Sequence, residues 1–256
     1  MSLPEQVHAL ADAYRILVHS VEDMNRLKQY SLVDNVALFP HGVMEHQPLD
    51  RMLARQQKGV TARQVIATYG FMLPHKGLED TLESLPGILS AHPDTHLLMV
   101  NALYPNPISQ EVLARCEELI KKHKLTGHVT LITAFLDDAG SLAWLDCADL
   151  VLFQYQNTAE SASGAVRYGL ATSRPVVCTP LPIFADVAEL VHSLDSTGPD
   201  AIARGVKALL DSPTRLASKS SKQLAWLHTR SWPNLGNRLA GMLEGAITDQ
   251  QSARLP

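Results

Sequence analysis

Cysteine is scarce in this chain of 256 residues: there are only three, Cys116, Cys147 and Cys178, and they lie far apart. An odd number of scattered cysteines argues against a disulfide framework and indicates a reducing compartment. We therefore expect a cytoplasmic protein in which each thiol is a small buried apolar group. Eleven histidines are present, but none forms an HExxH pair or another zinc spacing, so we expect no metal site.

Long apolar runs and long basic runs are also absent. No apolar run approaches the roughly 18 residues of a membrane span, and the N-terminus lacks a charged segment followed by an apolar one. We expect no transmembrane segment, while peripheral attachment to a membrane stays open. The net charge of −4 does not favour nucleic acid as a partner. With 46% apolar and 19% charged residues, the composition is that of an ordinary globular protein.

Short β-rich apolar runs alternate with longer amphipathic stretches, which is the pattern of βα units on a parallel sheet. The predicted strands are "YRILVHS", "VALFP", "QVIATYG", "THLLMVNA", "HVTLIT", "DLVLFQY" and "PVVCT". Helices are predicted near residues 20–30, 77–90, 107–123, 138–146 and 162–172, and from "DAIARGVKALLDS" to about residue 245. The expected fold class is α/β, a doubly wound Rossmann-like parallel sheet with extra C-terminal helices.

A seam is predicted at "FPHGVMEHQPLDRMLARQQKG", where Pro40, Gly42 and Pro48 interrupt the pattern. The two strands and two helices before it are too few for an independent core of ordinary size. The five strands after it make a whole doubly wound domain. We therefore expect a remnant of another domain with its linker over residues 1–45, a sheet domain over 46–230, and a C-terminal helix and tail over 231–256.

Ligands of open parallel sheets bind outside the carboxyl ends of the strands, so binding residues are expected in the loops that follow strands. In "YGFMLPHKGLED", Gly70 allows close approach to the backbone and Pro74 shapes the turn. Lys76 and Gly77 stand where a helix begins, and a lysine beside helix-terminal amides suits a phosphate. The alternative is a turn whose lysine is simply solvated.

A second loop leads from "DLVLFQYQNTAE" into "SASGAVRYGLA". The small residues at its helix start would leave the N-terminal amides uncovered, which predicts an anion site, and Arg167 one turn later could clamp a phosphate. Glu160 would repel a phosphate, so it fits better as an acceptor for hydroxyl groups of a sugar or ribose. In the alternative interpretation, Glu160 is a charge favourable to the helix dipole and the small residues are packing.

Two further loops follow strands. In "LITAFLDDAGSL", Asp137 or Asp138 is expected to cap a helix. The loop "VNALYPNP" is polar enough at Asn101, Tyr104 and Asn106 to line a cleft, but indicates no specific chemistry.

Four segments together resemble the donor-binding half of the GT-B fold retaining glycosyltransferases of the group 1 family: "GFMLPHKG", "HVTLITAFLDD", "ADLVLFQYQNTAE" and "ESASGAVRYGLATSRPVV". Their order and spacing agree over residues 64 to about 190. Residues 1–45 resemble the last strand, helix and linker of the family's N-terminal acceptor-side domain, and "TRSWPNLGNRLAGML" resembles its closing helices. The resemblance implies that most of the acceptor-binding domain has no counterpart in this chain.

The resemblance also implies roles for residues. Lys76 would contact the donor diphosphate and Glu160 would bind hydroxyls of the transferred sugar. Donor binding is further expected at Gly70, Phe71, His75, Phe135, Ser161, Ala162, Ser163, Gly164 and Tyr168.

This chain departs from the family pattern at two of these positions. Phe71 stands where many members have an arginine, which removes one diphosphate contact, and Arg167 is expected to compensate as a third catalytic residue. Tyr168 stands where a glutamate holds the ribose, and it offers one hydroxyl instead of a bidentate acceptor.

The activity implied is retaining transfer of a hexose, mannose or a related sugar, from a UDP- or GDP-sugar to a glycan acceptor in polysaccharide biosynthesis, without a metal or other cofactor. The acceptor domain would come from another chain or from a second copy of this one. One alternative is a degenerate, non-catalytic donor-type domain that serves as a binding or structural module. A third interpretation is a sugar-nucleotide epimerase, whose catalytic acids would have to come from a domain this chain lacks.

Overall fold

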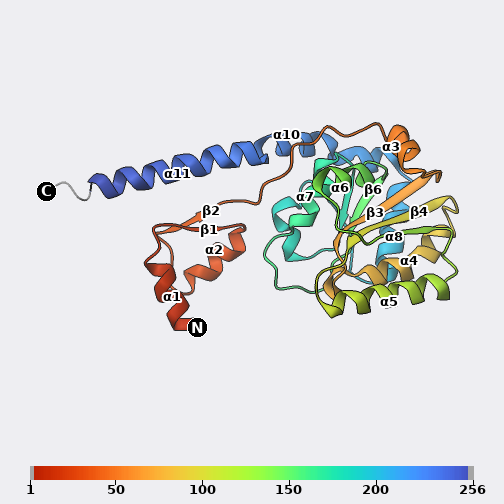
Figure 1. Cartoon of the computed structure of the whole chain (residues 1–256), viewed down its shortest axis with the longest axis horizontal. Coiled ribbons are helices and arrows are strands. Elements are labelled where there is room, and N and C mark those ends of the chain that lie inside the picture. The colour runs from red at the N-terminus through yellow and green to blue at the C-terminus, as the bar shows by residue number, and fades with distance from the viewer. Residues whose placement is uncertain (1–2, 253–256) are drawn as a thin grey trace.

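The computed structural model describes residues 3–252, and a six-stranded parallel sheet forms the core of its larger lobe, on the right in Figure 1. The spatial order is β5–β4–β3–β6–β7–β8. The strands are β3 (Gln64–Phe71), β4 (Thr95–Ala102), β5 (Val129–Ile132), β6 (Leu150–Phe153), β7 (Val176–Cys178) and β8 (His192–Ser193). The chain moves outward from β3 to β5 and then returns to β6, on the other side of β3. Strand order therefore reverses between β3 and β6, and such a switch point is where open sheets bind ligands.

Helices cover both faces of the sheet, as the doubly wound expectation requires. One face carries α4 (Leu78–Leu89), α5 (Pro107–Lys122) and α8 (Pro199–Leu210); the other carries α3 (Arg51–Lys58), α6 (Asp138–Leu145) and α7 (Gly164–Ala171). Within β3, Val65 and Ala67 join the core under α6 and α7, while Ile66 joins the core under α4 and α8. The near-continuous apolar strands thus follow from burial on both sides.

All seven predicted strands are confirmed, and the structure adds elements that the sequence pattern missed. Strand β8 has two residues, too few for a periodic signal. Helix α3 lies in the polar segment interpreted as a seam; Asp50 caps it by accepting from the amides of Met52 and Leu53, and Gly59 ends it at φ +68°. Its capping signals are visible in the sequence, but its apolar face is narrow.

The remaining elements lie at the two ends of the chain. Helix α1 (Leu3–Ala11), for which no bounds were predicted, comes first; β1 (Ile16–Val18), α2 (Val21–Lys28) and β2 (Val36–Leu38) follow it, and β1 pairs with β2 in parallel. These are the two strands and two helices expected before the seam. We call residues 3–38 the N-terminal unit and residues 51–230 the main domain. After α8 come α9 (Pro213–Leu216), α10 (Ser220–Arg230) and α11 (Trp232–Ser252), and short 3-10 turns span Pro74–Lys76, Pro182–Val187 and Ala217–Lys219. The domain bounds expected at 45 and 230 stay a prediction.

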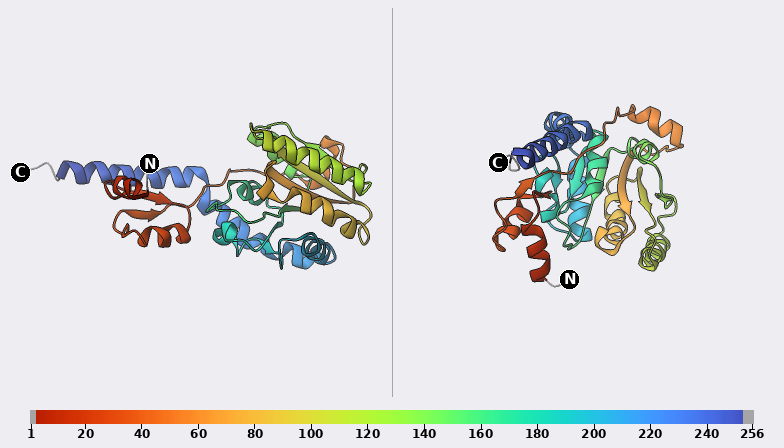
Figure 2. Two further views of the ribbon diagram at one scale, coloured as in Figure 1. Left: turned by 90° about the horizontal axis from the view of Figure 1, so that it is seen from below. Right: turned by 60° about the vertical axis from the view of Figure 1, so that its left-hand side comes forward.

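Helix α11 leaves the main domain and lies along the N-terminal unit (Figures 1 and 2). The Tyr14 hydroxyl donates a hydrogen bond of 2.6 Å to Asp249, and Arg238 donates one of 2.9 Å to the Leu38 carbonyl. Where the linker and the start of α11 cross, Val43 and Ser231 form a parallel bridge. Two segments of the chain therefore connect the N-terminal unit with the main domain, and these two segments are hydrogen-bonded to each other.

One buried arginine ties α3 to the sheet. Arg55 is 4% exposed, and its guanidinium donates to Asp149 at 2.6 Å, to the Cys147 carbonyl at 2.8 Å and to the Arg63 carbonyl at 3.1 Å. Asp149 also accepts from the amide of Val65 at 2.7 Å. This network fixes the end of the linker against the start of the sheet.

The cysteines agree with the sequence interpretation, since Cys116, Cys147 and Cys178 are all buried and free. Burial raises the pKa of the Cys116 thiol to about 12 and raises the pKa of the other two thiols. They behave as small apolar groups rather than as reactive thiols. Across residues 3–252, no helix combines the length and the apolar character needed to cross a membrane.

Candidate functional site

A cavity of about 440 Å³ opens at the carboxyl edge of the sheet, beside the switch point between β3 and β6. It is lined by the end of β3, the loops after β5 and β6, and the first turns of α6 and α7. Nine of the twelve residues expected to bind or act on a donor line it: Gly70, Phe71, Lys76, Phe135, Glu160, Ala162, Ser163, Gly164 and Tyr168. The topology brings these residues together because parallel strands end at the same edge.

The loop after β6 packs against the turn that carries Lys76 and holds it in place. Gly77 has φ +65°, and a Cβ there would collide with the carbonyl oxygen of Gln154. The Gln154 side-chain amide donates to the Lys76 carbonyl at 2.8 Å, and the backbone amide of Gln156 donates to the His75 carbonyl at 2.8 Å. Glycine is thus required at 77, and the protein itself fixes the lysine at the cavity.

Lys76 sits between an aromatic ring and a carboxylate. Its ammonium lies 3.9 Å from the centroid of the Tyr155 ring and 3.3 Å from Oε2 of Glu160. Burial lowers the pKa of Lys76, and the charge of Glu160 opposes that shift. His75 lies outside the cavity lining, with Nε2 3.4 Å from Oε1 of Glu160; burial and then the charge of Lys76 lower its pKa. Glu160, which is half exposed, therefore balances a cation that would otherwise be unpaired.

Small residues let three segments meet at the start of α7. Gly70 has φ +127°, and a Cβ on it would lie 3.5 Å from that of Ala165. A Cβ on Gly164 would lie 3.4 Å from Nε2 of His41, which comes from the linker. Ser163 is the N-cap: its hydroxyl accepts from the amide of Val166 at 3.2 Å. The other first-turn amides have no acceptor within the helix, so this terminus is suited to an anion.

Two expectations about this segment need correction. The guanidinium of Arg167 is buried, pairs with Asp186 and donates to the Ser163 carbonyl at 2.7 Å. It lies outside the cavity lining and holds the cap of α7 instead of reaching into the site as a phosphate clamp. Helix α7 begins at Gly164 rather than 162, and Ser161 lines a separate hollow of about 90 Å³ shared with α2. The compensation for Phe71 expected from Arg167 is therefore not in place.

Aromatic rings form the mouth of the cavity on the β5 side. The rings of Phe71 and Phe135 are stacked at 16° with centroids 6.1 Å apart, and Tyr104 meets Phe71 edge-on at 5.1 Å. Phe135 is 78% exposed. A large exposed ring at a cavity mouth offers a flat surface for a planar ligand such as a nucleobase.

Sequence reasoning missed several residues that build this site. Gln154 and Tyr155 lie in the quoted loop after β6, and their place directly after a buried strand was a usable signal. His41 and Asp186 gave no local signal, because they reach α7 from the linker and from the turn after β7. Asp137 or Asp138 was expected to cap a helix; Asp137 does so, and Asp138, for which no role in binding was expected, lines the cavity.

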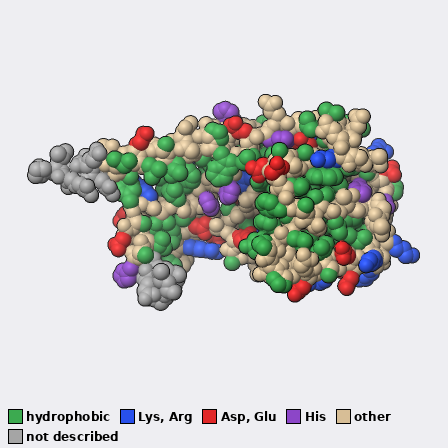
Figure 3. Space-filling view, in the orientation of Figure 1, with side chains coloured by type: hydrophobic (Ala, Val, Ile, Leu, Met, Phe, Trp, Pro, Cys, Tyr) green, Lys and Arg blue, Asp and Glu red, His purple; other side chains and the backbone are tan. Residues whose placement is uncertain are grey.

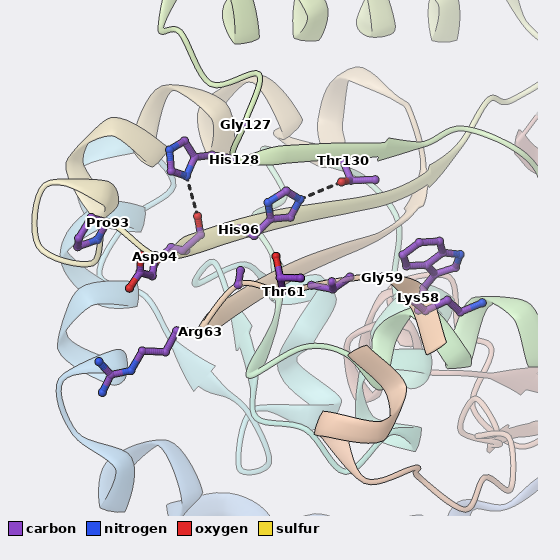
Figure 4. Close-up of a pocket in the computed structure, with 14 residues that line it drawn as sticks. Lys58, Gly59, Thr61, Arg63, Pro93, Asp94, His96, Gly127, His128 and Thr130 are labelled. Atoms are coloured by element: carbon purple, nitrogen blue, oxygen red, sulfur yellow. Dashed lines mark hydrogen bonds between the residues drawn. The ribbon is translucent and has the colours of Figure 1, made fainter. Parts of the chain in front are cut away.

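A second hollow of about 580 Å³ lies at the opposite, amino edge of the sheet (Figure 4). Three of its polar side chains are engaged within the protein: His96 bonds the Thr130 hydroxyl at 2.8 Å, His128 bonds the Thr95 carbonyl at 3.0 Å, and Lys58 lies over the Trp144 ring. Burial and then repulsion by His128 lower the pKa of His96. None of the expected site residues lines this hollow. The candidate site is therefore the cavity at the carboxyl edge.

Comparison with known proteins places this geometry on a known fold. No family model and no curated protein matches the sequence. HepE of Anabaena in complex with UDP is similar in structure, with a TM-score of 0.80 and 15% identity over 95% of this chain and 68% of that one. Sucrose-phosphate synthase from Thermosynechococcus elongatus gives a TM-score of 0.80 and 16% identity over 95% of this chain and 61% of that one.

A third structure covers the sheet domain by itself. It is the C-terminal domain of a glycosyl transferase group 1 family protein, LpcC, from Francisella tularensis, with a TM-score of 0.60 and 16% identity over 73% of this chain and 96% of that domain. This chain thus spans roughly two thirds of the length of the larger neighbours. At such identities the likeness establishes the fold, and the expected resemblance is confirmed at that level: the chain has the fold of the GT-B glycosyltransferases, with one whole Rossmann-like half.

Proposed function

We propose that the chain is the donor-binding part of a glycosyltransferase and takes a UDP- or GDP-sugar into the cavity at the carboxyl edge. The observation that carries the proposal is the pairing of Lys76 with Glu160 at the N-terminus of α7. A fixed cation beside open helix amides suits a diphosphate, and a half-exposed carboxylate next to it suits sugar hydroxyls. HepE has been crystallised with UDP and with UDP-glucose, which supports this ligand class.

The chemistry follows from where negative charge develops. When the bond between the sugar and the diphosphate breaks, the leaving oxygen gains charge, and Lys76 with the α7 amides would stabilise it without reorganisation. This proposal includes no metal and no protein nucleophile. Retention would result from attack of the acceptor hydroxyl on the face that the diphosphate leaves. We further propose a hexose such as mannose as the sugar, polysaccharide assembly as the setting, and the cytoplasm as the location, which three reduced cysteines support.

The acceptor would approach from the hollow between the N-terminal unit and the main domain. Histidine and acidic side chains gather beside that hollow (Figure 3), and a cavity of about 270 Å³ there is lined by His19, Asp186 and Arg230. Large apolar side chains are exposed on the N-terminal unit and α11: Tyr14, Leu17, Val21, Tyr30, Val33, Trp232, Leu243 and Ile247. They support the proposal that an acceptor domain of another chain, or a second copy of this one, covers this part.

Calorimetric titration of the chain with UDP, GDP, UDP-glucose and GDP-mannose tests the proposal. We expect micromolar binding of one base and not the other. Absence of binding by all four ligands would exclude it. A second candidate, a non-catalytic donor-type module, is favoured by the seclusion of Arg167. It predicts binding without release of nucleoside diphosphate from the sugar nucleotide when glycan acceptors and the acceptor domain are both supplied, whereas a transferase releases it.

Glu160→Gln should separate binding of the diphosphate from binding of the sugar. Losing the carboxylate frees Lys76 from its partner, so affinity for UDP or GDP alone should rise a few-fold. The extra affinity conferred by the sugar should fall by about tenfold, because a hydrogen bond to a charged group is lost. Glu189→Gln is the matched control, since Glu189 forms an exposed ion pair with Lys222 and does not line the cavity. Equal behaviour of the two variants in calorimetry would remove Glu160 from the donor site.

A further inference from the structure

Two consecutive aspartates begin α6, and the structure gives them different tasks. Asp137 is the N-cap, and its Oδ1 accepts from the amide of Gly140 at 2.7 Å. Asp138 is thereby released from capping, and it lines the cavity together with Ser141 one turn later. A carboxylate that the helix does not need therefore faces the space that the proposed donor would fill.

Tyr168 holds this carboxylate in place. Its hydroxyl donates a hydrogen bond of 2.5 Å to Oδ1 of Asp138, and its ring packs on the ring of Tyr69 at a centroid distance of 4.6 Å. Burial, then the contact with Asp138, raise the pKa of Tyr168, so the hydroxyl keeps its proton and donates. Among the residues that the structure describes, no other hydrogen bond to Asp138 is seen, which leaves Oδ2 available as an acceptor.

The cavity thus has two carboxylates with different surroundings. Glu160 lies against Lys76, whereas Asp138 lies against a tyrosine hydroxyl and beside the aromatic mouth formed by Phe71 and Phe135. A ligand whose diphosphate meets Lys76 can carry a pair of hydroxyls on each side of its phosphates. One pair can then reach Glu160 and the other pair can reach Asp138. A carboxylate with a free oxygen can accept from two neighbouring hydroxyls, which a single tyrosine hydroxyl cannot do.

On the basis of the proposed function, we propose that Asp138, positioned by Tyr168, binds the vicinal hydroxyls of the ribose and makes the chain selective for ribonucleotides. Tyr168 is then not itself the replacement for an acidic acceptor. It positions one, Asp138, which belongs to the neighbouring helix α6. Asp138 contacts the ligand, and Tyr168 is a positioning residue that acts through it.

The test is calorimetric titration of the full chain with UDP against 2′-deoxy-UDP and with GDP against 2′-deoxy-GDP. The unmodified chain should prefer the ribonucleotide of its base by about tenfold or more, since the lost hydrogen bond is to a charged group. Asp138→Asn should reduce that ratio to near one. Tyr168→Phe should give an intermediate ratio, because the carboxylate stays but loses its orientation.

Asp137→Asn is the matched control. It removes the same charge one residue away, and asparagine caps a helix as well as aspartate does. It should therefore keep both the fold, measured by thermal unfolding, and the preference for ribose. If the unmodified chain binds the ribo and deoxy forms equally, or if Asp138→Asn keeps the preference, the inference is overturned while the proposed function stands. If no nucleoside diphosphate binds, the proposed function is overturned and this inference with it.

Discussion

Replacing Lys76 with alanine should weaken binding of the preferred nucleoside diphosphate by about ten- to a hundredfold, because charge-assisted hydrogen bonds to phosphate from a buried lysine are lost. Gly77, Gln154 and Gln156 hold the backbone of its turn, and the side chain already lies over the Tyr155 ring and against Glu160. Little of the binding energy is therefore spent on ordering the lysine. Glu160 is half exposed and can be hydrated again when its partner is removed. Calorimetry on the variant and the unmodified chain measures the difference, and thermal unfolding should change little.

Lys58→Ala provides the comparison for Lys76→Ala. Lys58 also lies over an aromatic ring, Trp144 at 4.9 Å, but at the amino edge of the sheet. Its removal deletes the same charge and a similar cation–π contact without touching the cavity, so affinity for the nucleotide should be unchanged. An equal loss in both variants would show that net charge, rather than a site at Lys76, governs binding.

Arg55→Met should lower the free energy of unfolding by about 3–5 kcal/mol, the cost typical of breaking a buried ion pair from one side. Arg55 is 4% exposed. Its removal leaves the carbonyls of Cys147 and Arg63 without this hydrogen-bond donor, and Asp149 loses one of its partners. Methionine fills a similar volume, so the loss reports the polar network rather than a cavity. Urea unfolding monitored by circular dichroism gives the value.

Arg51→Met measures how much the exposed edge of this network contributes to the free energy of unfolding, apart from its buried part. Arg51 also pairs with Asp149, at 2.6 Å, but its side chain is 44% exposed, so solvent replaces most of what the pair contributes. Its loss should cost roughly 0–1 kcal/mol. If the two variants unfold alike, burial does not control the strength of this network, and the account of how α3 is anchored is wrong.

The sheet could be predicted from the sequence because its strands are buried on two faces and read as apolar runs, as in "THLLMVNA". The meeting of Lys76 with Glu160, 84 positions apart, followed from one topological rule, since both follow strands that end at the same edge. Both inferences start from short patterns in the sequence. The topology of the fold then determines which of the residues in those patterns lie close together.

The partners of single side chains could not be obtained in the same way. Arg167 pairs with Asp186 and does not line the cavity; Asp186 lies in the 3-10 turn Pro182–Val187, and no sequence spacing predicts that pair. Asp137 and Asp138 are equally good caps by residue type, and only the backbone decides which one is used. Helix α3 was missed because its polar sequence carries a weak apolar stripe, while a buried arginine supplies much of its attachment.

The bridge between Val43 and Ser231 has a mechanical consequence. Val43 donates its amide to the Arg230 carbonyl at 2.9 Å and accepts from the amide of Trp232 at 3.2 Å, and Gly42 lies so close to the Trp232 ring that a Cβ would not fit. Both connections between the N-terminal unit and the main domain are thus clamped at one level. Any change in the angle between the two parts must bend both connections at this bridge, with α11 as the lever arm. The pivot of that motion is therefore set by the covalent path of the chain, and not by whatever occupies the space between the two parts.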